Sequence, residues 1–312
     1  MEENEKNAPA YMIGTWAWGS GMAGSRMVFG QSYNEKELWK AFCAATDAGY
    51  WLWDTAEVYG MGNAEKILGK FRKRRPDIQI STKCMPKRRY VYGNMTKSLE
   101  KSMSRLGIEY ADIYWLHVPV QIGKNLEEMA ELVKKGKVKQ IGVSNFNLRQ
   151  LKMAQKKLAL LGCRISCVQN HYSLLSHRKE DDEMIAWCKK HGIVYYSYMV
   201  LEQGALTGRF DSRHPFPAWS NRWLSFPKWR LKKIEPLLRY MRMLAKRHHA
   251  TVSQVAIRWA VNKGTVPVIG VTKDSYVEDL KEAETLFLSH AEMEKLEELA
   301  AHTGLMMKGI WE

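Results

Sequence analysis

Residues 112–143 read DIYWLHVPVQIGKNLEEMAELVKKGKVKQIGV, and they hold two short apolar runs separated by a segment of helical period. The runs, Asp112 to Leu116 and Lys139 to Val143, predict β-strands. Between them, the capping-box pattern Asn125-Leu-Glu-Glu128 predicts a helix start, and Gly136 predicts its end. The residues that would share one buried face of this helix are Leu126, Met129, Ala130 and Val133. A strand, a helix and a second strand in this order form a unit with parallel strands.

The same alternation repeats along the whole chain. Asn34-Glu-Lys-Glu37 and Asn147-Leu-Arg-Gln150 predict further helix starts. Because eight apolar runs alternate with helical segments and no proline-rich or serine-rich linker interrupts them, we expect a single α/β domain, a (β/α)8 TIM barrel over residues 1–312. The runs predicted to be strands are Met12 to Trp16, Trp51 to Trp53, Ile78 to Thr82, Asp112 to Leu116, Lys139 to Val143, Ile165 to Gln169, Ile193 to Tyr198 and Val266 to Gly270.

Three segments depart from this alternation. Residues Leu201 to Leu237 are rich in aromatic residues and contain four prolines, so we expect a long loop after the seventh strand that covers the catalytic face. An extra C-terminal helix is predicted from Ala291 to Ala301. Gly19-Ser-Gly-Met-Ala-Gly24 matches the G-x-G-x-x-G pattern of Rossmann dinucleotide sites, but Ser25 to Gly30 lacks a helical pattern, and we interpret the glycines as part of a loop.

The chain has 48 basic and 33 acidic residues and a formal net charge of +15. We attribute much of this excess to solvated helix surfaces such as Lys70 to Arg75. No DNA-binding or RNA-binding motif accompanies the charge and no apolar segment is long enough to span a bilayer, so neither nucleic acid nor a membrane is an expected partner. The N-terminus does not resemble a secretory signal, which favours a cytoplasmic location. Five scattered cysteines lack metal-ligand spacing, so no metal site is expected.

Polar residues follow the predicted strands where each strand ends, on the face where such barrels hold their active sites. Asp54, Tyr59, Lys83 and His117 make chemical sense together. A free phenol has a pKa near ~10 and is poorly matched to proton transfer at neutral pH. We expect the ammonium of Lys83 to lie against Tyr59 and lower its pKa, while Asp54 keeps Lys83 charged. His117 would orient a carbonyl oxygen; the purely structural alternative is a buried salt bridge between Asp54 and Lys83.

Several motifs, taken in order, resemble those of aldo-keto reductases, and the resemblance extends from Met12 to the last helix. It implies a nicotinamide cofactor and hydride transfer to an aldehyde or ketone. It also implies that Tyr59 is the general acid, tuned by Lys83 and Asp54, with His117 placing the carbonyl. The motifs are Asp54-Thr-Ala-Glu-Val-Tyr-Gly60, Ser81-Thr-Lys83, Trp115-Leu-His-Val-Pro119, Ile141-Gly-Val-Ser-Asn145, Val168-Gln169 and Leu201-Glu-Gln-Gly-Ala-Leu-Thr-Gly208.

The resemblance further implies a set of cofactor contacts. Ser144, Asn145 and Gln169 would bind the carboxamide, and Tyr198 would stack on the nicotinamide ring. The other implied contacts are Gly14, Thr15 and Trp16 at the nicotinamide half, Leu201, Gln203 and Gly204 at the pyrophosphate, and Gly270, Lys273 and Tyr276 at the adenosine end.

Two places depart from the family pattern. Met199-Val200 stands where Ser-Pro is usual, and Tyr276 and Leu280 stand where Arg or Gln and then Asn are usual. Lys273 can still meet a 2′-phosphate, so we expect NADPH, with NADH as the alternative.

The substrate is an aldehyde or ketone, and its pocket is expected on the loops. Trp18, Tyr90, Trp219 and Trp223 would wall it, which favours an apolar or aromatic carbonyl compound; equally, tryptophans on long loops can serve only to pin those loops. An alternative function is a protein that senses NADP(H) and turns over slowly, since it would keep the same four residues. A third alternative is nucleic-acid binding through the basic surface.

Overall fold

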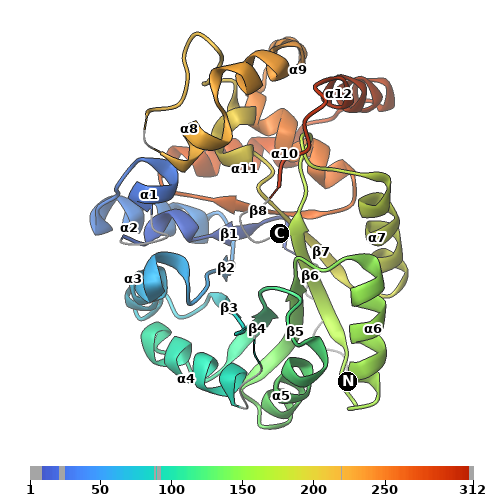
Figure 1. Cartoon of the computed structure of the whole chain (residues 1–312). Helices are drawn as coiled ribbons and strands as arrows, with labels where there is room; N and C mark the ends of the chain where they lie inside the picture. Colours follow the sequence, from blue (N-terminus) through green and yellow to red (C-terminus); the bar gives the residue numbers. More distant parts are fainter. Residues whose placement is uncertain (1–8, 21–24, 88, 90–92, 219, 309–312) are drawn as a thin grey trace.

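The computed structural model describes residues 9–20, 25–87, 89, 93–218 and 220–308. Eight parallel strands form a closed barrel in which neighbours in sequence are neighbours in space, and the last strand closes onto the first (Figure 1). Each strand occupies a run that the sequence predicted, with ends that differ by at most two residues, so the (β/α)8 barrel is confirmed. The strands are β1 (Met12–Gly14), β2 (Leu52–Asp54), β3 (Gln79–Cys84), β4 (Ala111–Leu116), β5 (Val138–Ser144), β6 (Ile165–His171), β7 (Val194–Tyr198) and β8 (Val266–Gly270).

Helices surround the barrel between successive strands (Figure 1). Short 3-10 segments follow three of the strands: η1 (Trp16–Trp18), η2 (Tyr59–Gly62) and η3 (Glu202–Thr207). The last helix confirms the predicted C-terminal one. The α-helices are α1 (Ser25–Phe29), α2 (Glu35–Asp47), α3 (Asn63–Arg72), α4 (Asn94–Leu106), α5 (Ile122–Lys134), α6 (Leu148–Ala159), α7 (Lys179–Lys190), α8 (Asn221–Ser225), α9 (Lys228–Arg247), α10 (Val252–Asn262), α11 (Ser275–Thr285) and α12 (His290–His302).

Two of the three predicted capping boxes form. The side chain of Asn34 accepts a hydrogen bond from the backbone of Glu37 at 2.8 Å, and that of Asn147 accepts one from Gln150 at 2.9 Å. The box at Asn125 was predicted wrongly, because α5 already begins at Ile122. Asn125 lies in the first turn of the helix, and its Nδ2 donates to the carbonyl of Val120 at 2.7 Å.

The glycine-rich segment after β1 is followed by a short helix that the sequence analysis did not expect. Ser25–Phe29 forms α1, whereas residues 21–24 lie outside the described part of the chain. The strand order of the closed barrel follows the sequence without reversal, so no doubly wound sheet is present among the described residues. The G-x-G-x-x-G match at Gly19 is therefore not a Rossmann site.

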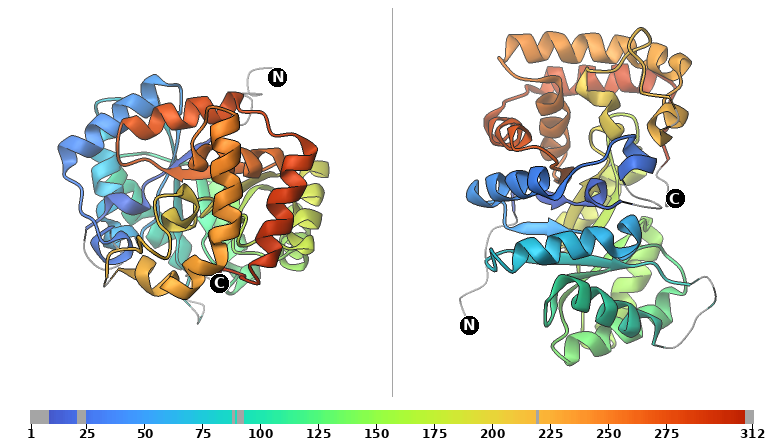
Figure 2. Two further views of the ribbon diagram at one scale, coloured as in Figure 1. Left: turned by 90° about the horizontal axis from the view of Figure 1, so that it is seen from above. Right: turned by 90° about the vertical axis from the view of Figure 1, so that its left-hand side faces the viewer.

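The segment from Leu201 to Leu237 is not the single long loop that we expected. It contains η3, α8 and the start of α9, a 20-residue helix that buries Leu231, Ile234 and Leu237 on one face. Pro227 precedes the helix and Pro236 lies inside it, so prolines that indicated a loop are tolerated in a helix here. Viewed from above, α9 runs across the molecule (Figure 2).

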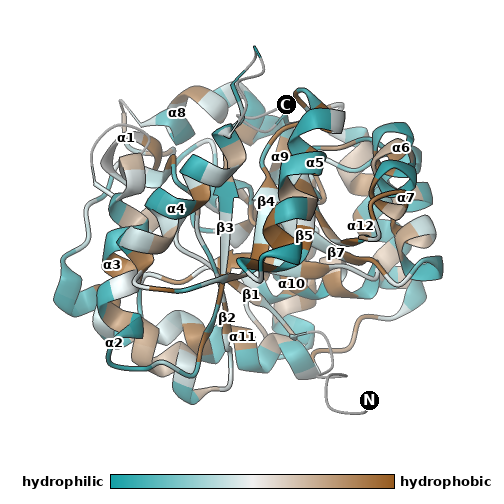
Figure 3. Cartoon of the chain, turned by 90° about the horizontal axis from the view of Figure 1, so that it is seen from below, coloured by the Kyte–Doolittle hydropathy of each residue, from teal (hydrophilic) through white to brown (hydrophobic). Residues whose placement is uncertain are grey.

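Two apolar layers stabilise the barrel. The larger layer lies between strands and helices, and the smaller fills the barrel interior with Met12, Leu52, Ile113, Trp115, Cys167 and Tyr196. Trp115 requires glycine beside it: a Cβ added to Gly142 would lie 2.2 Å from the indole. The hydrophilic residues gather on the outer faces of the surrounding helices (Figure 3). Within the described residues, no helix is long and apolar enough to span a bilayer.

Candidate active site

A cavity of about 480 Å³ lies at the carboxyl ends of the barrel strands, and residues of η3 and α8 also line it. The fold brings most of the predicted site residues to its wall. Lys83 lies behind the wall and is fully buried, and Thr15 is buried as well. The predicted residues that line the cavity are Gly14, Trp16, Asp54, Tyr59, His117, Ser144, Asn145, Gln169, Tyr198, Leu201, Gln203, Gly204, Gly270 and Tyr276.

Asp54 and Lys83, at neighbouring strand ends of β2 and β3, form a buried ion pair. Lys83 Nζ donates to Asp54 Oδ2 and also to the carbonyl oxygen of Thr55, the latter at 3.0 Å. The other carboxylate oxygen of Asp54 accepts from Ser81 Oγ at 2.6 Å, and Ser81 Oγ accepts from Trp115 Nε1 at 2.5 Å. The pair is thus held on several sides, as a buried charge pair must be.

Tyr59 lies directly over this ion pair, in η2 after β2. Lys83 Nζ is 5.1 Å from the centroid of its ring. The indole of Trp16 stacks on the phenol with centroids 6.0 Å apart, and His117 meets it edge-on with centroids 6.2 Å apart. The glycine next to the phenol is required: Gly60 has φ +55° and a Cβ there would lie 2.7 Å from the Ser20 carbonyl oxygen.

The pKa of Tyr59 differs from our expectation. Burial raises the pKa of the phenol well above its usual value, and the nearby carboxylate of Asp54 raises it further. We had predicted that Lys83 would lower it; instead the desolvation of the phenol outweighs the ammonium, whose charge is already compensated by Asp54. Burial also lowers the pKa of Lys83, which Asp54 opposes. Burial lowers the pKa of His117 well below its usual value, and the charge of Lys83 lowers it further. The imidazole of His117 is therefore neutral at neutral pH.

The ends of β5, β6 and β7 form a second hydrogen-bonded group. Ser144 Oγ donates to the Gln169 carbonyl at 2.7 Å, and Asn145 Nδ2 donates to the His117 carbonyl at 2.9 Å. The hydroxyl of Tyr198 donates to Asn145 Oδ1 at 2.6 Å. Asn145 adopts φ 62°, a conformation that asparagine tolerates better than most residues and that turns its side chain into the cavity wall.

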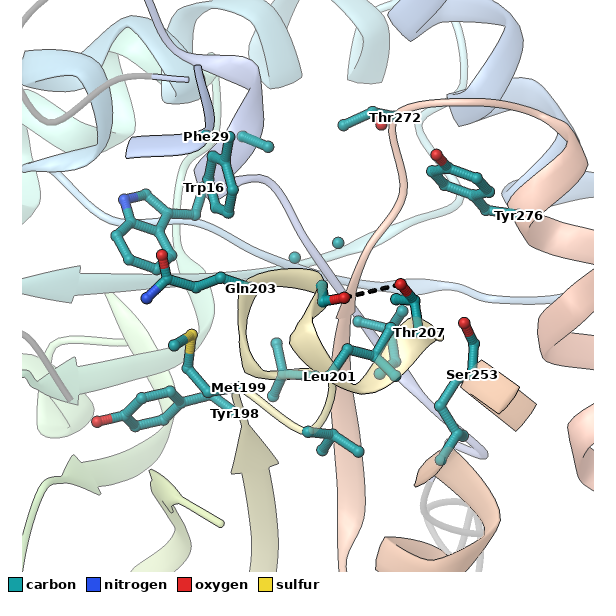
Figure 4. A pocket seen from close by; sticks show the side chains of 18 of the residues that line it. Trp16, Phe29, Tyr198, Met199, Leu201, Gln203, Thr207, Ser253, Thr272 and Tyr276 are labelled. Carbon is teal, nitrogen blue, oxygen red and sulfur yellow. Dashed lines mark hydrogen bonds between the residues drawn. The ribbon is translucent and has the colours of Figure 1, made fainter. Parts of the chain in front are cut away.

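At the far end of the cavity the geometry differs in part from the prediction. Gly270 and Tyr276 line the cavity, but Lys273 is exposed and does not. Arg209 does line this end, and its Nη1 donates to the hydroxyl of Tyr276 at 3.3 Å. Thr272 and Ser253 also face this end (Figure 4). Thr272 follows β8 by two residues, whereas Ser253 lies in α10, where strand-end spacing could not have indicated it.

Arg222 is the most informative residue that the sequence analysis missed. It belongs to α8, lines the cavity and is 8% exposed, and its guanidinium donates to the carbonyls of Gln203 and Phe29. Among the described residues no carboxylate forms a salt bridge with it, and burial lowers its pKa. The sequence predicts a loop for this segment, and a loop pattern does not distinguish this arginine from the others.

The predicted substrate wall is largely not where we expected it. Trp18 is 2% exposed, packs against Trp53 and Phe71, and donates its Nε1 proton to the Val271 carbonyl at 2.8 Å, so it belongs to the core. Trp223 is exposed on α8 and does not line the cavity. Tyr90 and Trp219 lie outside the described residues. Apolar side chains that do line the cavity include Trp16, which stacks on Tyr59, Phe29, which packs edge-on against Trp16, and Met199 (Figure 4).

The lining fits an extended anionic ligand with polar groups along its length. Trp16 Nε1 and Gln203 Oε1 are buried and have no hydrogen-bond partner among the described residues. Two cations also line the cavity: Arg222, which contacts the Gln203 backbone, and Arg209, which contacts Tyr276. A nicotinamide dinucleotide, with a polar carboxamide, a charged pyrophosphate and an adenosine, matches this set of donors and cations.

Comparison with known proteins gives a consistent result. The model of the aldo/keto reductase family matches residues 11–301. Pyridoxal reductase of the Arabidopsis thaliana chloroplast is 33% identical over 86% of this chain and 76% of its own length. The NADH-specific methylglyoxal reductase of Escherichia coli is 28% identical over 92% of this chain and 93% of its own length. The crystal structure of the thermostable aldo-keto reductase Tm1743 with the inhibitor epalrestat is 28% identical, with a TM-score of 0.74 over 95% of this chain and 97% of that one.

Proposed function

This chain belongs to the aldo/keto reductase family and is an NAD(P)H-dependent oxidoreductase, and we propose that it reduces an aldehyde or ketone to the alcohol, using NADPH. We propose this activity for one domain that comprises residues 1–312. The observation that carries the proposal is the position of Tyr59, whose ring lies in the cavity wall over a fully buried Lys83–Asp54 pair. The names of the relatives, both reductases, support turnover rather than slow cofactor sensing.

Tyr59 is proposed as the general acid. Its raised pKa keeps the phenol protonated at neutral pH, so a proton is available for the carbonyl oxygen. As that proton leaves, negative charge develops on a phenol whose ring lies 5.1 Å from the Lys83 ammonium, and the ammonium stabilises it. Asp54 holds the ammonium in place and favours its charged form against burial. Lys83 thus stabilises the phenolate as it forms, even though the resting pKa is not lowered.

His117 is proposed to orient the carbonyl. Its pKa is low, so the imidazole is neutral and can donate one hydrogen bond without competing as an acid. It meets the ring of Tyr59 edge-on, which places both side chains on the same part of the cavity wall. A carbonyl oxygen held between them would receive the proton of Tyr59.

A bound nicotinamide cofactor would supply the hydride that goes to the carbonyl carbon. We propose that its carboxamide is held by Ser144, Asn145 and Gln169. The nicotinamide ring would lie against Tyr198, and this half of the cofactor would be bordered by Gly14, Thr15 and Trp16. We propose that the pyrophosphate is bound by Leu201, Gln203 and Gly204. Arg222, which contacts the Gln203 backbone, would bind it as well. We propose that the adenosine end is bound by Gly270, Tyr276 and Arg209. Lys273 would reach a 2′-phosphate from the rim of the cavity.

NADPH is proposed over NADH because Arg209 and Lys273 supply two cations near that end of the cavity, where a 2′-phosphate would bind. The relative from Escherichia coli is named as NADH-specific, so NADH is the alternative. The substrate is proposed to be an apolar or aromatic carbonyl compound, since Trp16 stacks on Tyr59 and Phe29 packs against Trp16 in the cavity wall. The name of the Arabidopsis relative makes pyridoxal, an aromatic aldehyde, the first compound to try.

Turnover of NADPH with a panel of aromatic and aliphatic aldehydes tests the proposal. Tyr59→Phe is expected to lower kcat on the order of a thousandfold and to leave the cofactor Kd unchanged. Tyr33→Phe is the matched control: Tyr33 lines the same cavity, but its hydroxyl donates to the side chain of Gln31 at 2.6 Å. Full activity in Tyr59→Phe would refute the assignment of the acid, and no turnover of any carbonyl by the wild-type protein would refute the function.

A further inference from the structure

The positive charge of the chain is concentrated on α8 and α9. Residues 221–247 contain nine Arg and Lys residues and one acidic residue, Glu235, so this segment accounts for +8 of the net +15. The sequence analysis attributed the excess charge to helix surfaces in general. In the fold, most of it belongs instead to two consecutive helices at one edge of the molecule (Figure 1).

The outer face of α9 carries several exposed cations. Its inner face packs against α10 and α12, while Lys232, Lys233, Arg239 and Lys246 are exposed on the opposite face. Glu235 is only half exposed and is already paired with Arg242 at 2.9 Å. At a rise of 1.5 Å per residue, Lys232 and Lys246 lie about 20 Å apart along α9, so the positive charge extends over that length of surface.

Large apolar side chains project from the same segment. Leu224 is 66% exposed, Trp229 54% and Trp223 38%, and Met243 is exposed further along α9. The cations accompany these side chains: Arg230 and Lys233 lie 5.1 Å and 5.7 Å from the ring of Trp229. Exposed tryptophans and a leucine beside lysines and arginines are typical of segments that lie at a membrane surface.

We propose that the α8–α9 face, residues 221–247, docks onto a membrane surface rich in anionic phospholipid. The lysines and arginines of α9 would attract the acidic headgroups, and Leu224, Trp223 and Trp229 would enter the interface. A nucleic acid is favoured less, because the face is the convex outer side of a helix rather than a groove, and because Leu224 and Met243 offer no surface on which bases stack. The peripheral contact needs no spanning segment, so it revises the expectation that membranes are not partners.

Flotation of the full-length protein with lipid vesicles tests this proposal. We expect the protein to float with phosphatidylcholine vesicles that contain about 30% phosphatidylserine, and not with pure phosphatidylcholine. Binding should weaken as salt is raised, because the attraction is screened within a Debye length. The double variant Lys232→Glu/Lys233→Glu should lower the partition coefficient at least about tenfold, and Trp229→Ala on the order of fivefold.

The matched control is Lys134→Glu/Lys135→Glu, an adjacent exposed pair at the end of α5 on a different part of the molecule (Figure 1). It changes the net charge of the protein by the same amount, so equal losses in both double variants would mean that only overall charge matters, and the docking face would be refuted. Absence of flotation with anionic vesicles at low salt would refute it as well. Tighter binding of single-stranded RNA than of vesicles, lost in Lys232→Glu/Lys233→Glu, would reassign the face to nucleic acid and overturn the membrane proposal.

Discussion

The imidazole of His171 stacks on the phenol of Tyr198, with ring centroids 5.5 Å apart and an angle of 22° between the planes. His171 is itself fixed by Glu202, whose Oε1 lies 2.7 Å from His171 Nε2 and also accepts from Ser173 Oγ. Glu202 is fully buried and adopts φ 47°, an unfavourable conformation for a residue other than glycine. The hydroxyl of Tyr198 is held by Asn145, so the ring is constrained both at its face and at its tip.

This stack predicts that His171 positions the cofactor through Tyr198. His171→Ala removes the ring on which Tyr198 rests and should weaken cofactor binding about tenfold, measured by fluorescence titration. His171→Phe keeps a ring in place and should restore most of the affinity. Both variants should lower the free energy of unfolding by about 1–3 kcal/mol, because Glu202 loses a partner while it stays buried. If the Ala and Phe variants bind the cofactor equally well, the stack has no positioning role.

The ion pair beneath Tyr59 predicts that the loss of one partner costs more stability than the loss of both. Lys83→Met leaves the carboxylate of Asp54 buried, which should lower the free energy of unfolding by about 3–5 kcal/mol in chemical denaturation. Lys83→Met combined with Asp54→Asn should be clearly more stable than Lys83→Met alone, while reductase activity is lost in both. Strictly additive effects of the two substitutions would show that the pair is not coupled.

The barrel and its strand-end residues could be predicted because they follow from local periodicity. An apolar run such as Asp112 to Leu116 predicts a strand from the local sequence alone. Parallel strands then bring the residues that follow them, such as Lys83 and His117, to one face. The same logic located Ser144, Gln169 and Tyr198 on the cavity wall.

The remaining features depend on packing that no local pattern records. Trp18 could not be distinguished from a loop tryptophan until Phe42, Phe71 and Trp53 were seen to enclose it. Arg222 became a candidate only once α8 was seen to turn it into the cavity, and the prolines around α9 concealed a helix whose stability comes from its buried face. The sign of the Tyr59 pKa shift was predicted wrongly because it depends on how completely the phenol is desolvated.

We predict that the positive charge of Arg222 strengthens cofactor binding. Arg222→Met should raise the Kd for NADPH by about ten- to a hundredfold, the range expected for loss of charge-assisted hydrogen bonds to a phosphate. The effect should shrink at high salt. Arg230→Met serves as the control, since that guanidinium bonds the Ser225 carbonyl at 2.6 Å and does not line the cavity. A Kd for NADPH that is unchanged in Arg222→Met would remove this arginine from the cofactor site.

The contacts of Glu292 allow a prediction of how the free energy of unfolding depends on pH. This carboxylate joins two helices: it accepts from His248 at 2.9 Å and from Arg247 at 3.1 Å at the end of α9, and it completes the capping box of α12 with Ser289. Burial tends to raise its pKa, but the hydrogen bonds from His248 and Ser289 outweigh this effect and lower the pKa to about 2, from an ordinary value of 4.5.

A carboxylate whose pKa is lower in the folded state stabilises that state above its unfolded pKa, and this contribution is lost as the pH falls. Between about pH 5 and pH 2, the wild-type protein should therefore lose up to roughly 3 kcal/mol more of its unfolding free energy than Glu292→Gln does. Glu298→Gln provides the comparison, because Glu298 is exposed and its pKa is lowered chiefly by the hydrogen bond from Lys295. It should barely alter the acid profile. Parallel profiles for the wild-type protein and Glu292→Gln over this range would mean that Glu292 does not link α9 to α12.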